Sequence, residues 1–130
     1  MIEFVIPGAP PTATAQQKGQ NRKTGAYYKT PELKDAEAKY MAWCGKNRPD
    51  RPLEGPVALT VVFNFPATKA HPDGGYKTTK PDTDNMLKLL KDCLTKCGFW
   101  KDDAQVAWEL TVKRHRDIPC VCIRIEELPE

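Results

Sequence analysis

The sequence lacks any apolar run long enough to cross a bilayer, which takes about 20 consecutive residues. Its first residues, Met1 to Phe4, include an acid and lack the basic and apolar regions of a signal peptide. No internal repeat or low-complexity segment is present. We therefore expect a soluble cytoplasmic protein with no membrane partner, and its 130 residues have room for one domain, residues 1–130.

Cysteine is present, but in no arrangement that predicts a disulfide framework or a zinc site. Five cysteines are an odd number for a secreted disulfide scaffold. Cys93 and Cys97 are four residues apart on a predicted helix, and Cys120 and Cys122 alternate on a predicted strand. The two histidines belong to neither pair, so no zinc-ligand motif is formed. We expect buried, reduced thiols.

The net charge of +3 is too small to indicate a partner by itself. Its distribution is more informative, because basic residues outnumber acids between Lys18 and Arg51. A basic N-terminal arm suits a polyanionic partner. On charge alone, however, a solvated loop is the better explanation.

The spacing of apolar residues predicts two helices and four main strands. The strands are expected at residues 2–6, 57–65, 105–113 and 120–126, and the helices at 31–47 and 84–97. In the third strand, Val106, Trp108, Leu110 and Val112 are expected to face inward. This order predicts an α+β domain, a mixed β-sheet with two main helices packed on one side.

Both helices carry readable start signals and apolar stripes. Thr30 and Pro31 predict the first start, through a capping hydroxyl and a proline in the first turn. In the second helix, Asp84, Lys88, Lys91 and Thr95 form a polar stripe opposite a broad apolar face.

Two segments without apolar periodicity, at about residues 9–29 and 67–80, predict mobile loops. Tyr27 and Tyr28 lie beside basic residues of the first loop. Aromatic and cationic side chains together can stack on bases and pair with phosphates. The two tyrosines are equally well explained as anchors of the loop to the core.

Three aspartates are candidates for a metal-dependent active site. Asp82 and Asp84 bracket one residue, so in extended backbone their side chains point the same way. Extending the alternation of the strand at 105–113 backwards puts Asp103 on its polar face and Asp102 on its core face. Carboxylates that hold a hard cation supply what phosphodiester hydrolysis needs: an activated water and charge relief on the phosphate. For Asp82 and Asp84 taken alone, helix capping is the better interpretation.

Two longer motifs favour the metal-binding interpretation of these aspartates over helix capping. The run Asp82 to Lys88, DTDNMLK, and the run Leu94 to Val106, LTKCGFWKDDAQV, closely resemble the RusA family of Holliday-junction resolvases. The resemblance is strong over about residues 80 to 113, looser at the N-terminal strand and weak elsewhere. Either motif alone is unspecific, whereas the two at this spacing are highly specific.

The resemblance implies a structure-selective endodeoxyribonuclease that acts on four-way junctions and related branched DNA as a homodimer. It implies that Asp82, Asp84 and Asp103 are catalytic and hold Mg²⁺, with Mn²⁺ as a substitute, and that Lys88 is the essential basic residue. Lys88 also lies one turn beyond Asp84 on the polar stripe, where a surface ion pair is the alternative explanation. Asn85 would orient the carboxylates or cap the helix, and Asp102 would be a supporting or structural acid. Phage, prophage and cellular origins all fit. Candidate DNA-binding residues are Arg22, Lys23, Lys69, Lys77, Lys80, Lys88 and Lys91.

Two other functions remain open from the sequence. One is a non-catalytic protein that only binds branched DNA, which the presence of all three aspartates and Lys88 disfavours. The other is a small structural protein whose acids are only helix caps.

Overall fold

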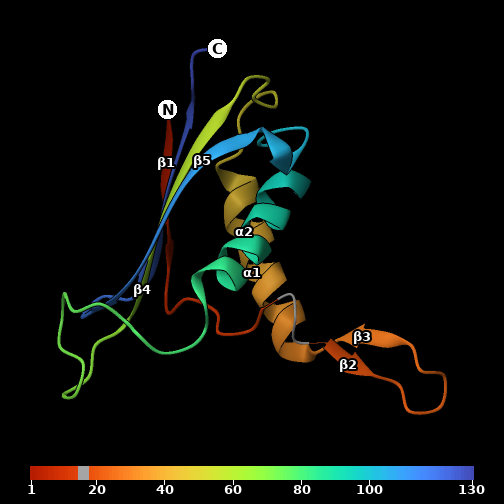
Figure 1. Ribbon diagram of the computed structural model, residues 1–130, viewed down its shortest axis with the longest axis vertical. Helices are drawn as coiled ribbons and strands as arrows, with labels where there is room; N and C mark the ends of the chain where they lie inside the picture. Colours follow the sequence, from red (N-terminus) through yellow and green to blue (C-terminus); the bar gives the residue numbers. More distant parts are fainter. Residues whose placement is uncertain (15–17) are drawn as a thin grey trace.

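Four strands form one sheet in the order β1-β6-β4-β5. The computed structural model describes residues 1–14 and 18–130, and Figure 1 shows the arrangement of its elements. β5 is parallel to β4, whereas β6 runs antiparallel to both β1 and β4. The sheet is therefore mixed, as predicted. The strands are β1 (Ile2–Pro7), β4 (Val57–Pro66), β5 (Val106–Arg116) and β6 (Cys120–Glu127).

Two helices, α1 (Pro31–Lys46) and α2 (Thr83–Lys96), cover one face of this sheet (Figure 1). The predicted start of α1 is confirmed, because the Thr30 hydroxyl accepts a hydrogen bond from the Leu33 amide at 3.3 Å. The α+β class with helices on one side is also confirmed. In the described part of the chain, neither helix is long and apolar enough to span a membrane.

The core lies between the sheet and the helices. Every second residue of β4 from Val57 to Phe65 is buried in it, which confirms the predicted alternation. The predicted apolar face of α2 is confirmed as well, and its buried members are Met86, Leu87, Leu89, Leu90, Cys93 and Leu94. Cys44 and Cys93 are buried, while the other three cysteines are half-buried. Burial raises the pKa of the Cys93 thiol to about 12, so this side chain is neutral at ordinary pH.

The predicted inward-facing set of β5 is wrong for its two largest members. Trp108 is 50% exposed and Leu110 is 47% exposed. β5 is an edge strand, and Glu109 between them contacts Lys91 of α2, so the residues flanking Glu109 point to the opposite face of the sheet. Trp108 and Leu110 therefore lie on the face of the sheet that no helix of the described chain covers, whereas Val106, at the register shift between β4 and β5, packs against the core.

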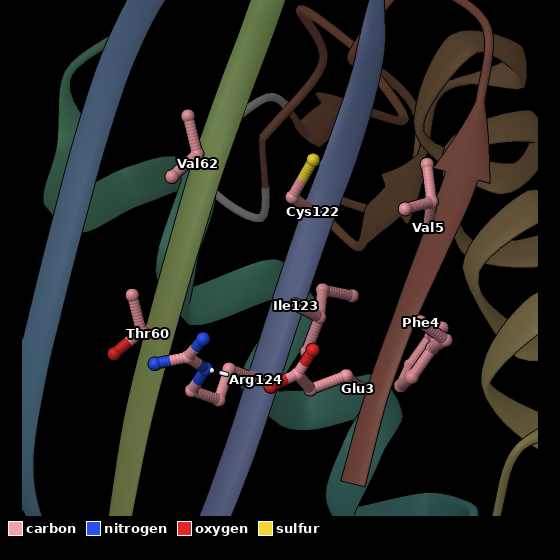
Figure 2. A pocket seen from close by; sticks show the side chains of 8 residues that line it. All are labelled: Glu3, Phe4, Val5, Thr60, Val62, Cys122, Ile123 and Arg124. Carbon is pink, nitrogen blue, oxygen red and sulfur yellow. Dashed lines mark ion pairs between the residues drawn. The ribbon is translucent and has the colours of Figure 1, made fainter.

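The open face of the sheet, which is the face that α1 and α2 do not cover, carries both polar and apolar side chains. A cavity of about 590 Å³ lies there, lined by residues of β1, β4 and β6. Figure 2 shows the side chains that line it. Arg124 Nε forms an ion pair with Glu3 Oε1 at 3.0 Å across β6 and β1. Val5 on the same face is 51% exposed.

The first predicted loop contains regular structure. β2 (Lys18–Gln20) and β3 (Tyr27–Lys29) form an antiparallel two-stranded ribbon that projects from the body (Figure 1). The prediction of an irregular segment is therefore wrong for these residues, which are short strands without an apolar face. The part of the predicted loop at residues 15–17 lies outside the described residues, and its mobility stays a prediction.

The second predicted loop is attached to the end of β5. The Gly74 amide donates to the His115 carbonyl at 2.7 Å, and the Lys77 amide donates to the Lys113 carbonyl at 3.0 Å. In the return direction, the His115 amide donates to the Gly75 carbonyl at 2.8 Å. Residues 74–77 thus cover the outer edge of β5 over its last residues.

The position of Leu90 in the core gives a test of the fold. Leu90 is fully buried, so Leu90→Ala removes packed methyl groups and should lower the free energy of unfolding by about 2–5 kcal/mol. Ile118→Ala is the control, because Ile118 is 80% exposed and should change it by less than about 0.5 kcal/mol. Urea denaturation measures both. Equal effects of the two substitutions would contradict the packing of α2 on the sheet.

Candidate active site

Asp82 and Asp84 lie at the N-terminus of α2, and Asp82 does not act as its cap. Asp82 occupies the N-cap position with extended backbone, yet its side chain makes no capping hydrogen bond. Asp84 follows in the first turn, and both side chains are exposed. The positive end of the helix dipole stabilises both carboxylates. The capping role that the sequence suggested for Asp82 is therefore absent, and its oxygens are available to a ligand.

The segment before Asp82 is fixed by Lys113 of β5. Lys113 Nζ donates to the Thr79 carbonyl at 2.7 Å and to the Pro81 carbonyl at 2.8 Å. Charge-assisted hydrogen bonds of this kind are stronger than neutral ones. They tie the start of α2 to the C-terminal end of β5. Strand alternation puts Lys113 on the same face as Glu109, but the sequence gives no sign of its partners, which are backbone carbonyl groups 34 and 32 residues away along the chain.

Lys88 lies one turn after Asp84, and its side chain is 63% exposed. Its ammonium forms an i,i+4 ion pair with Asp92, at 3.6 Å. Such an exposed pair contributes only a few tenths of a kcal/mol, so a phosphate can easily displace it. Lys91, one turn further, is paired with Glu109 and is largely buried. Lys88 is therefore the more available cation of the two.

Asp102 and Asp103 have different surroundings. Both precede β5, in and before a short 3₁₀ helix, η1 (Asp103–Gln105). The Asp102 carboxylate accepts from the Ala104 amide at 2.8 Å, and the Gln105 side chain accepts from the Asp102 amide at 3.2 Å. This reciprocal capping box gives Asp102 a structural role. The backward extension of the strand alternation to Asp103 was wrong, because η1 interrupts it.

Asp103 is half-buried and faces the C-terminal half of α2. It lines a cavity of about 300 Å³ together with Asp92, Thr95 and Lys96 of that helix. The link between α2 and η1 is held nearby, where Trp100 Nε1 donates to Thr95 Oγ1 at 2.7 Å. Asp103 thus lies beside the C-terminal end of α2, whereas Asp82 and Asp84 lie at its N-terminus.

The three predicted aspartates are not brought together within one chain. Thr95 follows Asp84 by about three turns of helix, or about 16 Å along the axis. Across residues 1–14 and 18–130, no three His, Cys, Asp or Glu side chains are grouped so that they could hold a metal ion. The chain by itself provides a two-carboxylate group with Lys88 nearby, and a separate carboxylate at the other end of α2.

The predicted DNA-binding residues lie mostly on two projecting segments. Arg22 and Lys23 are exposed in the turn between β2 and β3. Lys69 and Lys80 are exposed in the segment between β4 and α2, while Lys77 is half-buried with its ammonium 4.8 Å from the centre of the Phe65 ring. In Figure 1 the ribbon and this segment both project at the lower end of the molecule, where α2 begins.

Comparison with known proteins gives the class of the molecule. The family model described as "Endodeoxyribonuclease RusA" matches residues 8–126. The chain is 31% identical over 118 residues to the "Crossover junction endodeoxyribonuclease rusA" of Lactococcus phage r1t, covering 89% of this chain and 88% of that protein. It is also 29% identical over 139 residues to the "Uncharacterized protein YqaN" of Bacillus subtilis strain 168, covering 98% and 96%.

A small α+β domain with exposed carboxylates at a helix start is thus matched along most of its length by nucleases. The chain belongs to the RusA family of endodeoxyribonucleases. The resemblance inferred from residues 82–106 is confirmed, and the match extends well beyond them.

The different environments of Asp82 and Asp102 predict different effects on stability. Asp102→Ala removes the capping box of η1 and should lower the free energy of unfolding by about 1 kcal/mol. Asp82→Ala removes no capping hydrogen bond and should lower it by less than half as much. Chemical denaturation without metal compares the two. A larger loss for Asp82→Ala would show that this carboxylate caps α2 after all.

Proposed function

We propose that this endonuclease resolves Holliday junctions and related branched DNA as a homodimer, by paired, symmetric, Mg²⁺-dependent phosphodiester hydrolysis. The observation that supports the proposal most directly is the uncapped Asp82 carboxylate, next to Asp84 at a helix start within the region matched by the family. The name of the phage relative, a crossover junction endodeoxyribonuclease, supports the same substrate.

Asp82 and Asp84 fit a hard divalent cation in donor chemistry. Mg²⁺ keeps several waters and is commonly held in proteins by one or two carboxylates together with phosphate oxygens. When bound, it relieves charge on the scissile phosphate and lowers the pKa of a water; Mn²⁺ can substitute. The two exposed carboxylates would hold it at the positive end of α2, where the backbone amides also attract a phosphate.

Lys88 is the residue that would stabilise the negative charge on the phosphate as it is attacked. Its ion pair with Asp92 keeps the ammonium on the polar stripe of α2, one turn from Asp84. Arg22, Lys23, Lys69, Lys77 and Lys80 would follow the DNA backbones through phosphate contacts, which carry no sequence information. Lys91 is also proposed to contact DNA, but its contribution to binding should be smaller, because Glu109 already neutralises its charge.

A dimer suits the substrate for a geometric reason. A four-way junction has near two-fold symmetry, and its resolution needs two matched cuts. Two identical subunits related by a two-fold axis present two equivalent sites to it.

Asp82→Asn and Asp103→Asn should each abolish cutting of a synthetic four-way junction in Mg²⁺. Both should leave junction binding in a mobility-shift assay unchanged, because asparagine keeps the shape of the aspartate side chain and removes only its charge. Asp102→Asn is the matched control: asparagine also caps, so cutting should be retained. Wild-type cutting by either of the first two variants would refute the assignment of these residues.

The enzyme should cut a four-way junction in preference to a linear duplex of the same sequence, and chelation with EDTA should stop the cutting. The measurement is the initial rate of cleavage on the two substrates at the same salt concentration, since phosphate contacts make binding salt-dependent. Equal rates would indicate a general nuclease. Binding without any cleavage would indicate a non-catalytic junction-binding protein instead.

A further inference from the structure

We propose that Cys120, Cys122 and Asn64 form a second metal site, which binds the thiophilic cation Zn²⁺ on the open face of the sheet. The two thiols and the amide lie close together there, and Cys122 lines the cavity on that face. The helix that carries Asp82 covers the opposite face, so the two sites are separate. The inference does not depend on the proposed cleavage reaction.

Two neighbouring strands hold the three side chains in place. Cys120 and Cys122 are two residues apart on β6, so their side chains point to the same face of the sheet. Asn64 of β4 lies directly opposite Cys120 in the antiparallel register. β6 and β4 are the inner strands of the sheet, and each is paired on both sides. The backbone beneath the site is therefore well fixed, as a precise metal site requires.

The distances between the polar atoms match the edges of a tetrahedral zinc site. Cys120 Sγ and Cys122 Sγ are 3.8 Å apart. Asn64 Nδ2 lies 3.4 Å from the first sulfur and 3.7 Å from the second. Zn–S bonds of about 2.3 Å and a Zn–O bond of about 2.1 Å give a tetrahedron with an S–S edge of about 3.8 Å and S–O edges of about 3.6 Å. An ion can therefore bind at this point without movement of either strand.

The amide of Asn64 supplies the third donor. Asn64 is only 6% exposed, and in the described chain its Oδ1 is buried without a hydrogen-bond partner. A buried acceptor of this kind costs free energy, and a bound ion is one way to satisfy it. A half-turn of the amide about its last side-chain bond exchanges Oδ1 with Nδ2 and turns the oxygen toward the two sulfurs.

The charge balance of the site favours a divalent cation. Burial raises the pKa of the Cys122 thiol, as does its contact with Cys120, while the positive charge of Arg116 acts in the opposite direction. Zn²⁺ displaces one proton from each thiol, so the ion and the two thiolates together carry no net charge. A neutral unit is compatible with this half-buried position, whereas two thiolates without a cation would be costly there.

An ion can reach the thiols from the open face. Cys122 lines the cavity of about 590 Å³, and Figure 2 shows its side chain between Val5 and Val62. Sulfur ligands favour soft or borderline cations, whereas Mg²⁺ takes oxygen ligands. The thiol pair and the carboxylates of α2 should therefore prefer different metals.

The bound ion would join β4 to β6 beside the segment that connects β4 to α2. β4 ends at Pro66, shortly after Asn64. Asp73 of the connecting segment accepts a hydrogen bond at 2.7 Å from the Asp117 amide, just before β6. A structural zinc ion adds its binding free energy to that of folding. Zn²⁺ should therefore raise the melting temperature of the protein.

Titration of the metal-free, full-length protein with Co²⁺ tests the site. Tetrahedral Co²⁺ bound by thiolates gives an intense charge-transfer absorption that carboxylate ligands do not give. One Co²⁺ per chain should produce this absorption, and Zn²⁺ should remove it. Cys120→Ser and Cys122→Ser should each weaken binding by more than about 100-fold, because even loss of a supporting group costs about 10–100-fold. Cys97→Ser is the matched control, since it changes another half-buried thiol and should have no effect.

Absence of the charge-transfer absorption in the wild-type protein would overturn the site, and so would an equal loss in Cys97→Ser. Circular dichroism checks that each variant is folded. Alkylation of the wild-type protein gives a second measurement that needs no variant. Zn²⁺ should protect Cys120 and Cys122 from iodoacetamide but leave Cys97 unprotected, as read by mass spectrometry of the peptides. Equal labelling of Cys120 and Cys122 with and without Zn²⁺ would also overturn the site.

Substitutions of Asn64 separate a metal ligand from a purely structural amide. Asn64→Asp keeps an oxygen donor and adds a negative charge, so it should bind Zn²⁺ at least as tightly as the wild-type protein and gain more melting temperature from it. Asn64→Leu has a similar volume but no oxygen, and should bind Zn²⁺ more weakly. Wild-type affinity in Asn64→Leu would contradict the proposed ligand set. None of these measurements involves DNA cleavage, so failure of the proposed function would leave their outcome unchanged.

Discussion

The parallel pairing of β4 with β5 is the constraint on which the placement of the functional residues depends. Parallel neighbours cannot be joined by a tight turn, so the chain must return along the whole sheet, and α2 provides this return. Residues that precede the helix then lie near the C-terminal ends of β4 and β5. Residues that follow it lie near the N-terminal ends of these strands. The two family motifs occupy these two positions.

Much of the fold could be predicted from the sequence because its signals are local. The Thr30 cap, the alternation of β4 and the apolar face of α2 each depend on a few neighbouring residues, and the structure confirms all three. The orientation of Trp108 and Leu110 could not be predicted in this way. Their alternation is the same whether a helix or solvent lies over them, and only a long-range contact, that of Glu109 with Lys91 of α2, shows which face the helices cover.

The same distinction, between local signals and features set by the tertiary structure, applies to the candidate site. The residues proposed for it could be named from two short motifs. The family match confirms the resemblance that those motifs carry, whereas the role of each residue stays a prediction. Their separation could not be predicted, because a motif gives spacing along the chain but not which end of a helix each part reaches. Asp102 and Asp103 show the same limit. Strand alternation predicts different environments for these two residues, but the structural difference comes from the capping box that Asp102 forms at the start of η1.

The attachment of residues 74–77 to the end of β5 has a mechanical consequence. The backbone that carries Lys77 pairs with Lys113, and the side chain of Lys113 grips Thr79 and Pro81 at the entrance to α2. The segment between β4 and α2 is therefore attached to the end of β5 in two ways. Its main chain forms hydrogen bonds with the strand, and the Lys113 ammonium group binds its carbonyl groups. Loss of the Lys113 ammonium would therefore release both Thr79 and Pro81, the residue before Asp82, from the end of β5.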